Sequence, residues 1–264
     1  MANLTIDFFS LTLRRPVQFK MLIPNDLNPE WNPEQKRKTK KMKTLFLLHG
    51  YNGAAGNWVA EHLPTLYNFA IVMPNGENAF YTDGLSTGHQ YATFLAEELV
   101  GYVRKTFNLA MTREETYIMG YSMGGYGALR TALAYPETFG KTVGLSSALI
   151  VKGCANMKPG ESNPVANYEY YRECFGELSE VLTSRNNLEV LVDEILTQNK
   201  KMPEIYMACG LQDFLLEPNR DFNRFLEAKK VPHKYIESEG IHDMKFWDEY
   251  ARKFIPMLFE DDLE

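Results

Sequence analysis

A serine flanked by glycines has the clearest chemical potential in this sequence. Gly120-Tyr121-Ser122-Met123-Gly124 follows a short apolar run at residues 115–119 and precedes a helical pattern at residues 125–135. Gly-x-Ser-x-Gly between a strand and a helix is typical of a sharp turn that lifts the serine hydroxyl above a sheet edge. Only residues with almost no side chain fit around such a bend. We therefore expect Ser122 to be a nucleophile; the alternative is a structural serine in a glycine-rich connection.

A serine hydroxyl needs a base to take its proton, and the base needs an acid to orient it. With this turn motif the three residues follow the chain order serine, acid, histidine. His242 follows Gly240, just after the last predicted strand at residues 234–237, so it is the expected base. His233 precedes the same strand and lies at its wrong end. The remaining histidines, His49, His62 and His89, precede Ser122.

Asp213 is the expected acid of this group. It follows the predicted strand at residues 204–208 through Gly210, which places its carboxylate on a loop at the carboxyl end of that strand. The alternative is that Asp213 caps the helix that follows. Three other acids fit less well: Asp243 adjoins His242 and its side chain would diverge, while Asp193 and Glu194 belong to an insertion.

A tetrahedral intermediate also needs donors aimed at its developing negative charge. We expect the Met123 N–H, directly after the nucleophile, to supply one. The second should come from the turn after the strand at residues 44–48, where we expect the Tyr51 N–H to serve, with Asn52 as the alternate. His49-Gly50 in this turn can equally be a tight turn whose histidine does not touch substrate.

Strands and helices alternate along most of the chain, which predicts an α/β fold with a mostly parallel central sheet and helices on both faces. An antiparallel hairpin at residues 4–13 and 17–23 should form a sheet edge. The expected later strands are 44–48, 69–73, 115–119, 142–146, 204–208 and 234–237, and the expected helices are 89–106, 125–135, 218–229 and 245–258.

Residues 150–202 break this alternation and are expected to form a cap-like insertion within a single domain spanning residues 1–264. Such an insertion after a central strand is placed to roof the carboxyl ends of the strands, where ligands bind. Its bulky side chains, suited either to line an apolar pocket or to pack the insertion onto the body, are Met157, Tyr168, Tyr170, Tyr171 and Phe175.

Composition excludes several classes of protein. The 264 residues carry a net charge of −6, so we expect no nucleic-acid partner, and the basic cluster at residues 36–43 is interpreted as a solvated loop. Three cysteines show no metal-ligand spacing and suit a reducing compartment. The N-terminus does not resemble a secretory signal, and no apolar run of about 18 residues could span a membrane. The protein is expected to be soluble and cytoplasmic, without metal or membrane contact; a homo-oligomer is left open.

Several segments together resemble the esterase D and tributyrin esterase branch of the α/β-hydrolases. They are His49-Gly50-Tyr51-Asn52-Gly53 with Trp58, Met73-Pro74-Asn75-Gly76, Tyr81-Thr82-Asp83, Gly120-Tyr121-Ser122-Met123-Gly124-Gly125, Cys209-Gly210-Leu211-Gln212-Asp213, and Gly240-Ile241-His242-Asp243 with Trp247. The resemblance runs from about residue 45 to residue 258. It implies an α/β-hydrolase fold and a serine carboxylesterase without cofactor, with Ser122, Asp213 and His242 as its triad. Asn52, Tyr121 and Trp247, which lie in these segments, are expected to contact the substrate.

The resemblance leaves the acyl group open. Short-chain acyl esters are the expected substrates, with acetyl esters and feruloyl or cinnamoyl esters of plant polysaccharide within that range. The first alternative is an S-formylglutathione hydrolase, which resembles this branch and uses the same triad on a thioester. An alternative of another class is a non-catalytic binding module on the same fold.

Overall fold

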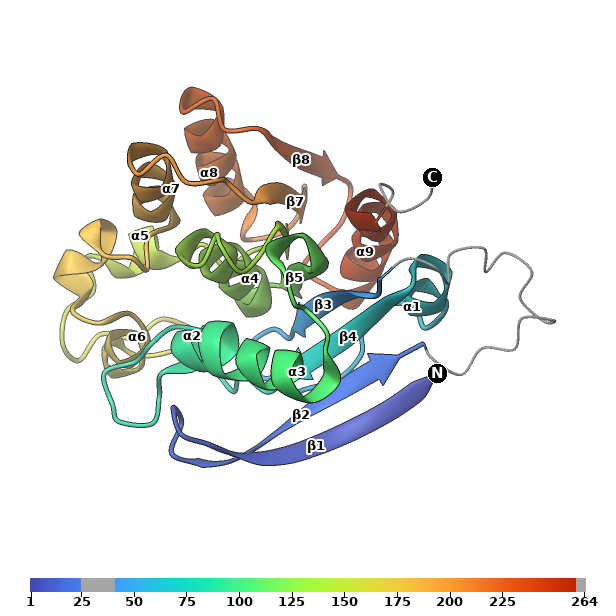
Figure 1. The fold of residues 1–264 in the computed structure, drawn as a ribbon. Coiled ribbons are helices and arrows are strands. Elements are labelled where there is room, and N and C mark those ends of the chain that lie inside the picture. Colours follow the sequence, from blue (N-terminus) through green and yellow to red (C-terminus); the bar gives the residue numbers. More distant parts are fainter. Residues whose placement is uncertain (25–40, 260–264) are drawn as a thin grey trace.

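One twisted sheet runs through the middle of the molecule (Figure 1). The computed structural model describes residues 1–24 and 41–259, and in that part of the chain the sheet has eight strands in the order β1-β2-β4-β3-β5-β6-β7-β8. The strands are β1 (Ala2–Ser10), β2 (Arg15–Ile23), β3 (Lys43–Leu48), β4 (Phe69–Pro74), β5 (Thr116–Tyr121), β6 (Lys141–Leu145), β7 (Glu204–Gly210) and β8 (His233–Ser238). The predicted basic loop falls mostly outside the described residues.

The hairpin and the parallel strands are confirmed. β1 pairs antiparallel with β2, and β2 antiparallel with β4, whereas β3 to β8 pair in parallel. The central strands are buried on both faces, as expected for strands of a covered parallel sheet. Their side chains alternate between two cores: Leu45 and Leu47 join one, and Phe46 and Leu48 join the other.

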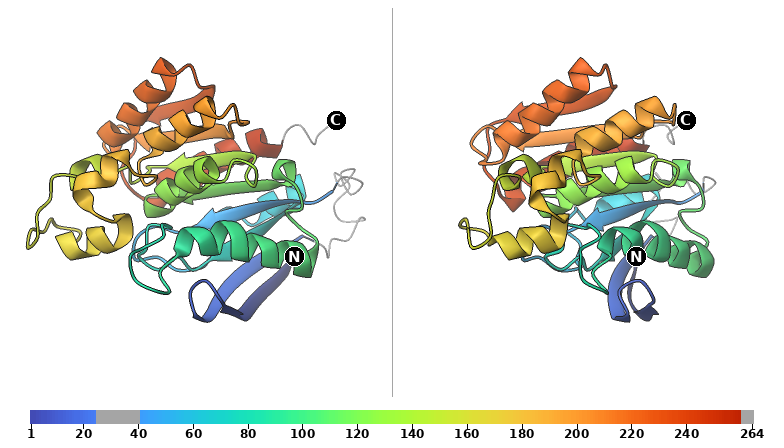
Figure 2. Two further views of the ribbon diagram at one scale, coloured as in Figure 1. Left: turned by 60° about the vertical axis from the view of Figure 1, so that its left-hand side comes forward. Right: turned by 90° about the vertical axis from the view of Figure 1, so that its left-hand side faces the viewer.

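Helices cover both faces of the sheet (Figure 2). One core packs under α1 (His62–Tyr67) and α9 (Met244–Phe259), which contact each other. The other packs under α2 (Tyr91–Thr93), which continues through a π-helical segment (Phe94–Leu99) into α3 (Val100–Phe107), and under α4 (Met123–Ala134), α7 (Leu188–Thr197) and α8 (Leu216–Ala228). The predicted helices are all present; α1, which contains Pro64, was not predicted.

The chain between β6 and β7 contains α5 (Val151–Cys154), α6 (Tyr168–Phe175), a 3-10 helix (Leu178–Thr183) and α7. The side chain of Asn167 accepts the Tyr170 N–H and that of Asn187 accepts the Glu189 N–H, so each of α6 and α7 begins at an asparagine cap. α7 packs on α4 as part of the helical layer. Figure 2 shows α6 and the 3-10 helix (yellow) projecting beyond one end of the sheet.

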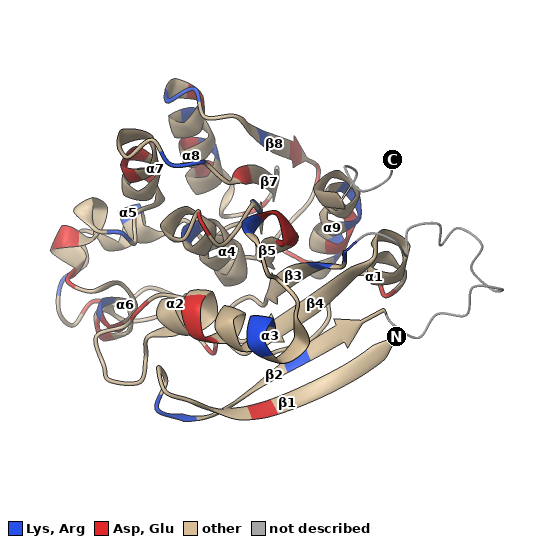
Figure 3. Cartoon of the chain, in the orientation of Figure 1, with Lys and Arg blue, Asp and Glu red and all other residues tan. Residues whose placement is uncertain are grey.

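Charged residues of both signs are interspersed over the helices and loops (Figure 3). Many of them form exposed ion pairs, such as Arg252 with Asp248 and Lys253 with Glu249 on α9. Among the described helices, none combines the length and the apolar character needed to cross a membrane.

Candidate active site

Ser122 lies at the turn that joins β5 to α4. Its backbone angles are φ 54° and ψ −120°, a region that residues with side chains rarely adopt. The turn is held on both sides, because the Ser122 N–H donates to the Leu145 carbonyl at 2.8 Å and the Ser122 carbonyl accepts the N–H groups of Tyr126 and Ala148. Such strain persists only where surrounding bonds over-determine it, and it is characteristic of functional sites.

Glycines are required around this turn for steric reasons. A Cβ atom on Gly120 would lie 2.1 Å from the Gly124 carbonyl oxygen. A Cβ on Gly124 would lie 2.6 Å from the carbonyl oxygens of both Leu48 and His49. The end of β3 therefore packs directly against the start of α4, which brings the loop after β3 next to Ser122.

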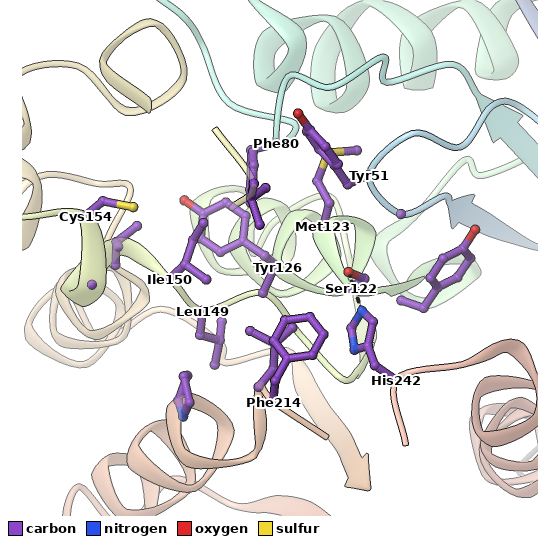
Figure 4. Close-up of a pocket in the computed structure, with 18 of the residues that line it drawn as sticks. Tyr51, Phe80, Ser122, Met123, Tyr126, Leu149, Ile150, Cys154, Phe214 and His242 are labelled. Atoms are coloured by element: carbon purple, nitrogen blue, oxygen red, sulfur yellow. Dashed lines mark hydrogen bonds between the residues drawn. The ribbon is translucent and has the colours of Figure 1, made fainter. Parts of the chain in front are cut away.

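Loops after two further strands bring His242 and Asp213 to the same place. The His242 Nε2 lies 2.9 Å from the Ser122 Oγ (Figure 4), and the His242 Nδ1 lies 2.9 Å from the Asp213 Oδ2. Since the carboxylate accepts the Nδ1–H, the neutral imidazole presents an unprotonated Nε2 to the serine hydroxyl. The arrangement can remove a proton from Ser122 and stabilise the imidazolium that results.

The Asp213 side chain is fully buried. Burial raises the pKa of its carboxyl, but the hydrogen bond from His242 and a second one from the Leu215 N–H (2.8 Å) outweigh that effect, so the pKa lies below its ordinary value. The carboxylate thus stays ionised at neutral pH, as an orienting acid must.

The other candidates for base and acid lie elsewhere. The Asp243 Oδ1 accepts the Phe246 N–H at 3.0 Å, and so caps the first turn of α9. His233 starts β8, where its ring nitrogens face the Val231 carbonyl and the Asn223 side chain. Asp193 lies on α7 and forms an ion pair with Lys229.

The loop after β3 contains the expected oxyanion donors. The Asn52 N–H donates to the Asn78 Oδ1 at 2.8 Å and is thereby occupied. Within residues 1–24 and 41–259, no protein acceptor binds the Tyr51 N–H. The Met123 N–H opens α4, where the first N–H groups of a helix have no intrahelical partner. Both Tyr51 and Met123 line the cleft beside Ser122.

His49 supports this loop from inside the protein. Its ring Nδ1 lies 2.8 Å from the Gly50 carbonyl oxygen, and its Nε2 accepts the Gly76 N–H at 2.9 Å. Burial lowers the pKa of His49, despite opposing hydrogen bonds to Gly50 and Asn75. The neutral ring therefore joins the loop after β3 to the turn after β4. Both segments belong to the sequence motifs, but no motif predicted a contact between them.

The cleft around Ser122 has a volume of about 780 Å³ and a largely aromatic and aliphatic wall (Figure 4). The segment between β6 and β7 supplies part of that wall, with Ile150, Val151 and Cys154 from the region of α5. Of the bulky insertion residues, Tyr171 lines the cleft; the others, Met157, Tyr168, Tyr170 and Phe175, pack against the core.

Asn52, Tyr121 and Trp247 all line the cleft. Tyr121 stacks on Trp247 with ring centroids 4.2 Å apart, and Trp247 meets the His242 ring edge to face at 4.9 Å. His242 also contacts Phe214, at 4.6 Å between centroids. Phe214 is 73% exposed at the cleft and was not predicted as a site residue.

The strand order, the parallel strands β3 to β8 and the serine at a strained turn after β5 define an α/β-hydrolase fold with a serine-hydrolase type of site. Comparison with known proteins gives the family. Residues 15–259 match the model of the family described as "Putative esterase", and this chain belongs to that family of carboxylic ester hydrolases.

Individual relatives agree with this assignment. An acetyl esterase from Caldicellulosiruptor saccharolyticus is 37% identical over 254 residues, covering 95% of each chain. Two solved structures from Staphylococcus aureus are each 27% identical and cover 98% of both chains. They are the fluorophosphonate-binding serine hydrolase FphF in a substrate-bound form (TM-score 0.82) and the S-formylglutathione hydrolase FrmB (TM-score 0.81).

Proposed function

We propose that this protein is a serine carboxylesterase that hydrolyses short-chain acyl esters through an acyl-enzyme on Ser122. The observation that carries the proposal is the line of hydrogen bonds from the Ser122 Oγ through His242 to the buried Asp213, open to a cleft at the serine end. A non-catalytic binding module has no need for a strained serine hydrogen-bonded to a histidine.

The geometry supports a two-step reaction. His242 Nε2 takes the proton as the Ser122 Oγ attacks the ester carbonyl carbon, and the same proton then passes to the departing alcohol oxygen. Water, activated by His242 in the same way, hydrolyses the acyl-serine and releases the acid. The N–H groups of Tyr51 and Met123 donate to the carbonyl oxygen while it carries negative charge. Every step uses groups of this chain and a water molecule.

Three observations support the finer assignments. The similarity to an acetyl esterase supports small acyl groups as the substrates of this protein. The α5 region closes one side of the cleft, as a cap that limits acyl length would. Cys154, Cys174 and Cys209 are buried free thiols, which supports the cytoplasm as the compartment.

Replacing Ser122 tests the reaction class. Ser122→Ala should lower kcat/KM for a short p-nitrophenyl ester by at least about 10³-fold, because only binding and oxyanion stabilisation remain. A fluorophosphonate should label the protein once, at Ser122, as judged by mass spectrometry of peptides. Labelling at another residue, or an active Ser122→Ala variant, would exclude the proposed nucleophile.

S-formylglutathione hydrolysis is the second candidate, favoured by the likeness to FrmB. One cleft cation, Lys152, forms an ion pair with Glu189 at 2.6 Å, so a carboxylate of glutathione would have to compete with Glu189 for it. Assays of S-formylglutathione beside p-nitrophenyl acetate, feruloyl esters and other short esters decide between the two. The larger kcat/KM is expected for the simple esters.

A further inference from the structure

Asn78, which lies in the loop after β4, makes a paired contact with the oxyanion loop. Its Oδ1 accepts the Asn52 N–H at 2.8 Å, and its Nδ2 donates to the Asn52 Oδ1 at 2.9 Å. The side-chain amide of Asn78 thus binds both the backbone N–H and the side-chain carbonyl oxygen of Asn52, so the two bonds close a ring and fix the position and the orientation of Asn52. No sequence motif indicated this contact between residues 26 positions apart.

This contact fixes the backbone conformation of Asn52, the residue that follows Tyr51. Asn52 has φ 59°, in the left-handed region that asparagine tolerates better than most residues. The Asn52 N–H points to Asn78, whereas no acceptor among the described residues binds the adjacent Tyr51 N–H, which is therefore available to a substrate oxygen. The Gly53 N–H bonds back to the Gly50 carbonyl at 3.0 Å, which closes the turn on its other side.

The backbone of Asn78 is held by the insertion. Its carbonyl oxygen accepts the Tyr170 hydroxyl from α6, and the Cys174 Sγ lies 3.8 Å from the same oxygen. α6 is in turn tied to the loop after β4, because the Cys174 carbonyl accepts the Thr82 hydroxyl and the Glu173 carboxylate accepts both the Ser86 N–H and hydroxyl. The ring of Tyr170 also meets the Tyr51 ring edge to face, with centroids 6.0 Å apart.

We infer that Asn78 is a positioning residue that aims the Tyr51 N–H at the developing oxyanion, and that α6 holds Asn78 in place for this purpose. The inference rests on the proposed function. Asn78 does not touch the reacting atoms; it acts through Asn52 and Tyr51. An N–H that is displaced weakens transition-state stabilisation more than substrate binding, because the oxygen carries full negative charge only in the tetrahedral state.

The Asn78→Ala variant tests this role. Loss of a complete oxyanion donor costs about 10²- to 10³-fold in kcat. In Asn78→Ala the Tyr51 N–H remains but is no longer held in its orientation, so kcat should fall by about 10-fold. KM for a short p-nitrophenyl ester should change less than about twofold, and the inhibition constant of a trifluoromethyl ketone should rise by the same factor by which kcat falls. The pH profile should keep its shape, since Asn78 does not contact His242.

Asn57→Ala is the matched control. Asn57 belongs to the same loop after β3 and also makes two hydrogen bonds, both to Val59, but none to Asn52 or Tyr51. Its removal should leave kcat and the inhibition constant within twofold of the wild type. Equal losses in the two variants would show a general loosening of the loop and would overturn the inference, as would a wild-type kcat in Asn78→Ala.

Asn52→Gly provides a second, independent variant if Asn78→Ala folds poorly. Glycine accepts the positive φ at this position, and the change removes one of the two bonds. The expected loss in kcat is about threefold, and the double variant should be no slower than Asn78→Ala, because both changes break one contact. Losses that multiply would overturn the inference. An active Ser122→Ala variant would instead refute the proposed function, so the two failures are distinguishable.

Discussion

Two histidines lie at opposite ends of the last strand, and their different roles follow from these positions. His242 follows β8 and meets Ser122 across 120 residues of sequence, whereas His233 starts β8 and meets Asn223 and the Val231 carbonyl. In a parallel sheet the carboxyl ends of strands converge on one edge, so a residue just after a strand reaches the site and one just before it does not.

Substitution of each histidine tests this difference. His242→Ala should lower kcat/KM by about 10³-fold or more, because Ser122 loses its general base. His233→Ala should retain activity within about threefold, because its contacts serve only the connection from α8 to β8. Steady-state kinetics at neutral pH, with thermal unfolding to verify folding, measure both. Inactivation by His233→Ala in a folded protein would contradict the assignment.

At the scale of the elements, the segment between β6 and β7 supplies part of the cleft wall. α6 is bound to the loop after β4 by side-chain and backbone hydrogen bonds, and α7 packs on α4. The insertion thus rests on the body of the molecule at two places. Ile150, just before α5, forms part of the cleft wall beside Tyr126 in Figure 4.

A chain-length series tests the insertion as the limit on the acyl group. Each added methylene that is buried contributes about 0.8 kcal/mol, or roughly fourfold in kcat/KM, until the pocket is full. With p-nitrophenyl esters of about two to twelve carbons, kcat/KM should rise from acetyl to about butyryl and then fall. A rate that still climbs at about eight carbons would indicate an open groove.

Ile150→Ala should move that optimum to a longer chain, because the smaller side chain enlarges the cleft. Leu182→Ala is the matched control: Leu182 belongs to the insertion but is 42% exposed and does not line the cleft. Its acyl preference should equal that of the wild type. An unshifted optimum in Ile150→Ala would place the limit elsewhere.

At the scale of the whole molecule, one buried histidine contributes to the stability of the fold and also holds the loops of the site together. His49 joins the loop after β3 to the turn after β4 through its neutral ring. Burial lowers its pKa in the folded protein below the ordinary value of about 6.5. The unfolded chain therefore binds a proton at a higher pH than the folded chain does.

The sign of the pH effect follows. Stability from His49 is fully present above about pH 6.5 and is lost as the pH falls from there toward the folded pKa, with a slope of at most about 1.4 kcal/mol per pH unit. His49→Gln cannot titrate and keeps an acceptor for the Gly76 N–H, so its free energy of unfolding should fall less steeply from pH 7 to pH 5. Denaturant unfolding of both proteins at several pH values measures the slopes. Parallel curves would show that His49 does not contribute.

Local sequence was sufficient to predict the alternating strands and helices, the turn at Ser122, and Asp213 and His242 at the ends of β7 and β8. The reason is that periodicity, glycine requirements and strand-end position act over a few residues, and the parallel sheet then places all strand ends at one edge. α1 escaped prediction because a six-residue helix containing a proline carries too little periodic signal.

Tertiary structure alone decided the contacts between distant segments. Asn78 binds the Asn52 N–H, which leaves the Tyr51 N–H as the proposed oxyanion donor, and His49 supports that loop through the Gly76 N–H. Which insertion side chains reach the cleft depends on how α6 docks: Tyr171 and Phe175 both pack in the core, and of these two only Tyr171 also lines the cleft. Hydrogen bonds and packing contacts between segments far apart in the sequence produce no periodic pattern in it, so they can be seen only in the folded chain.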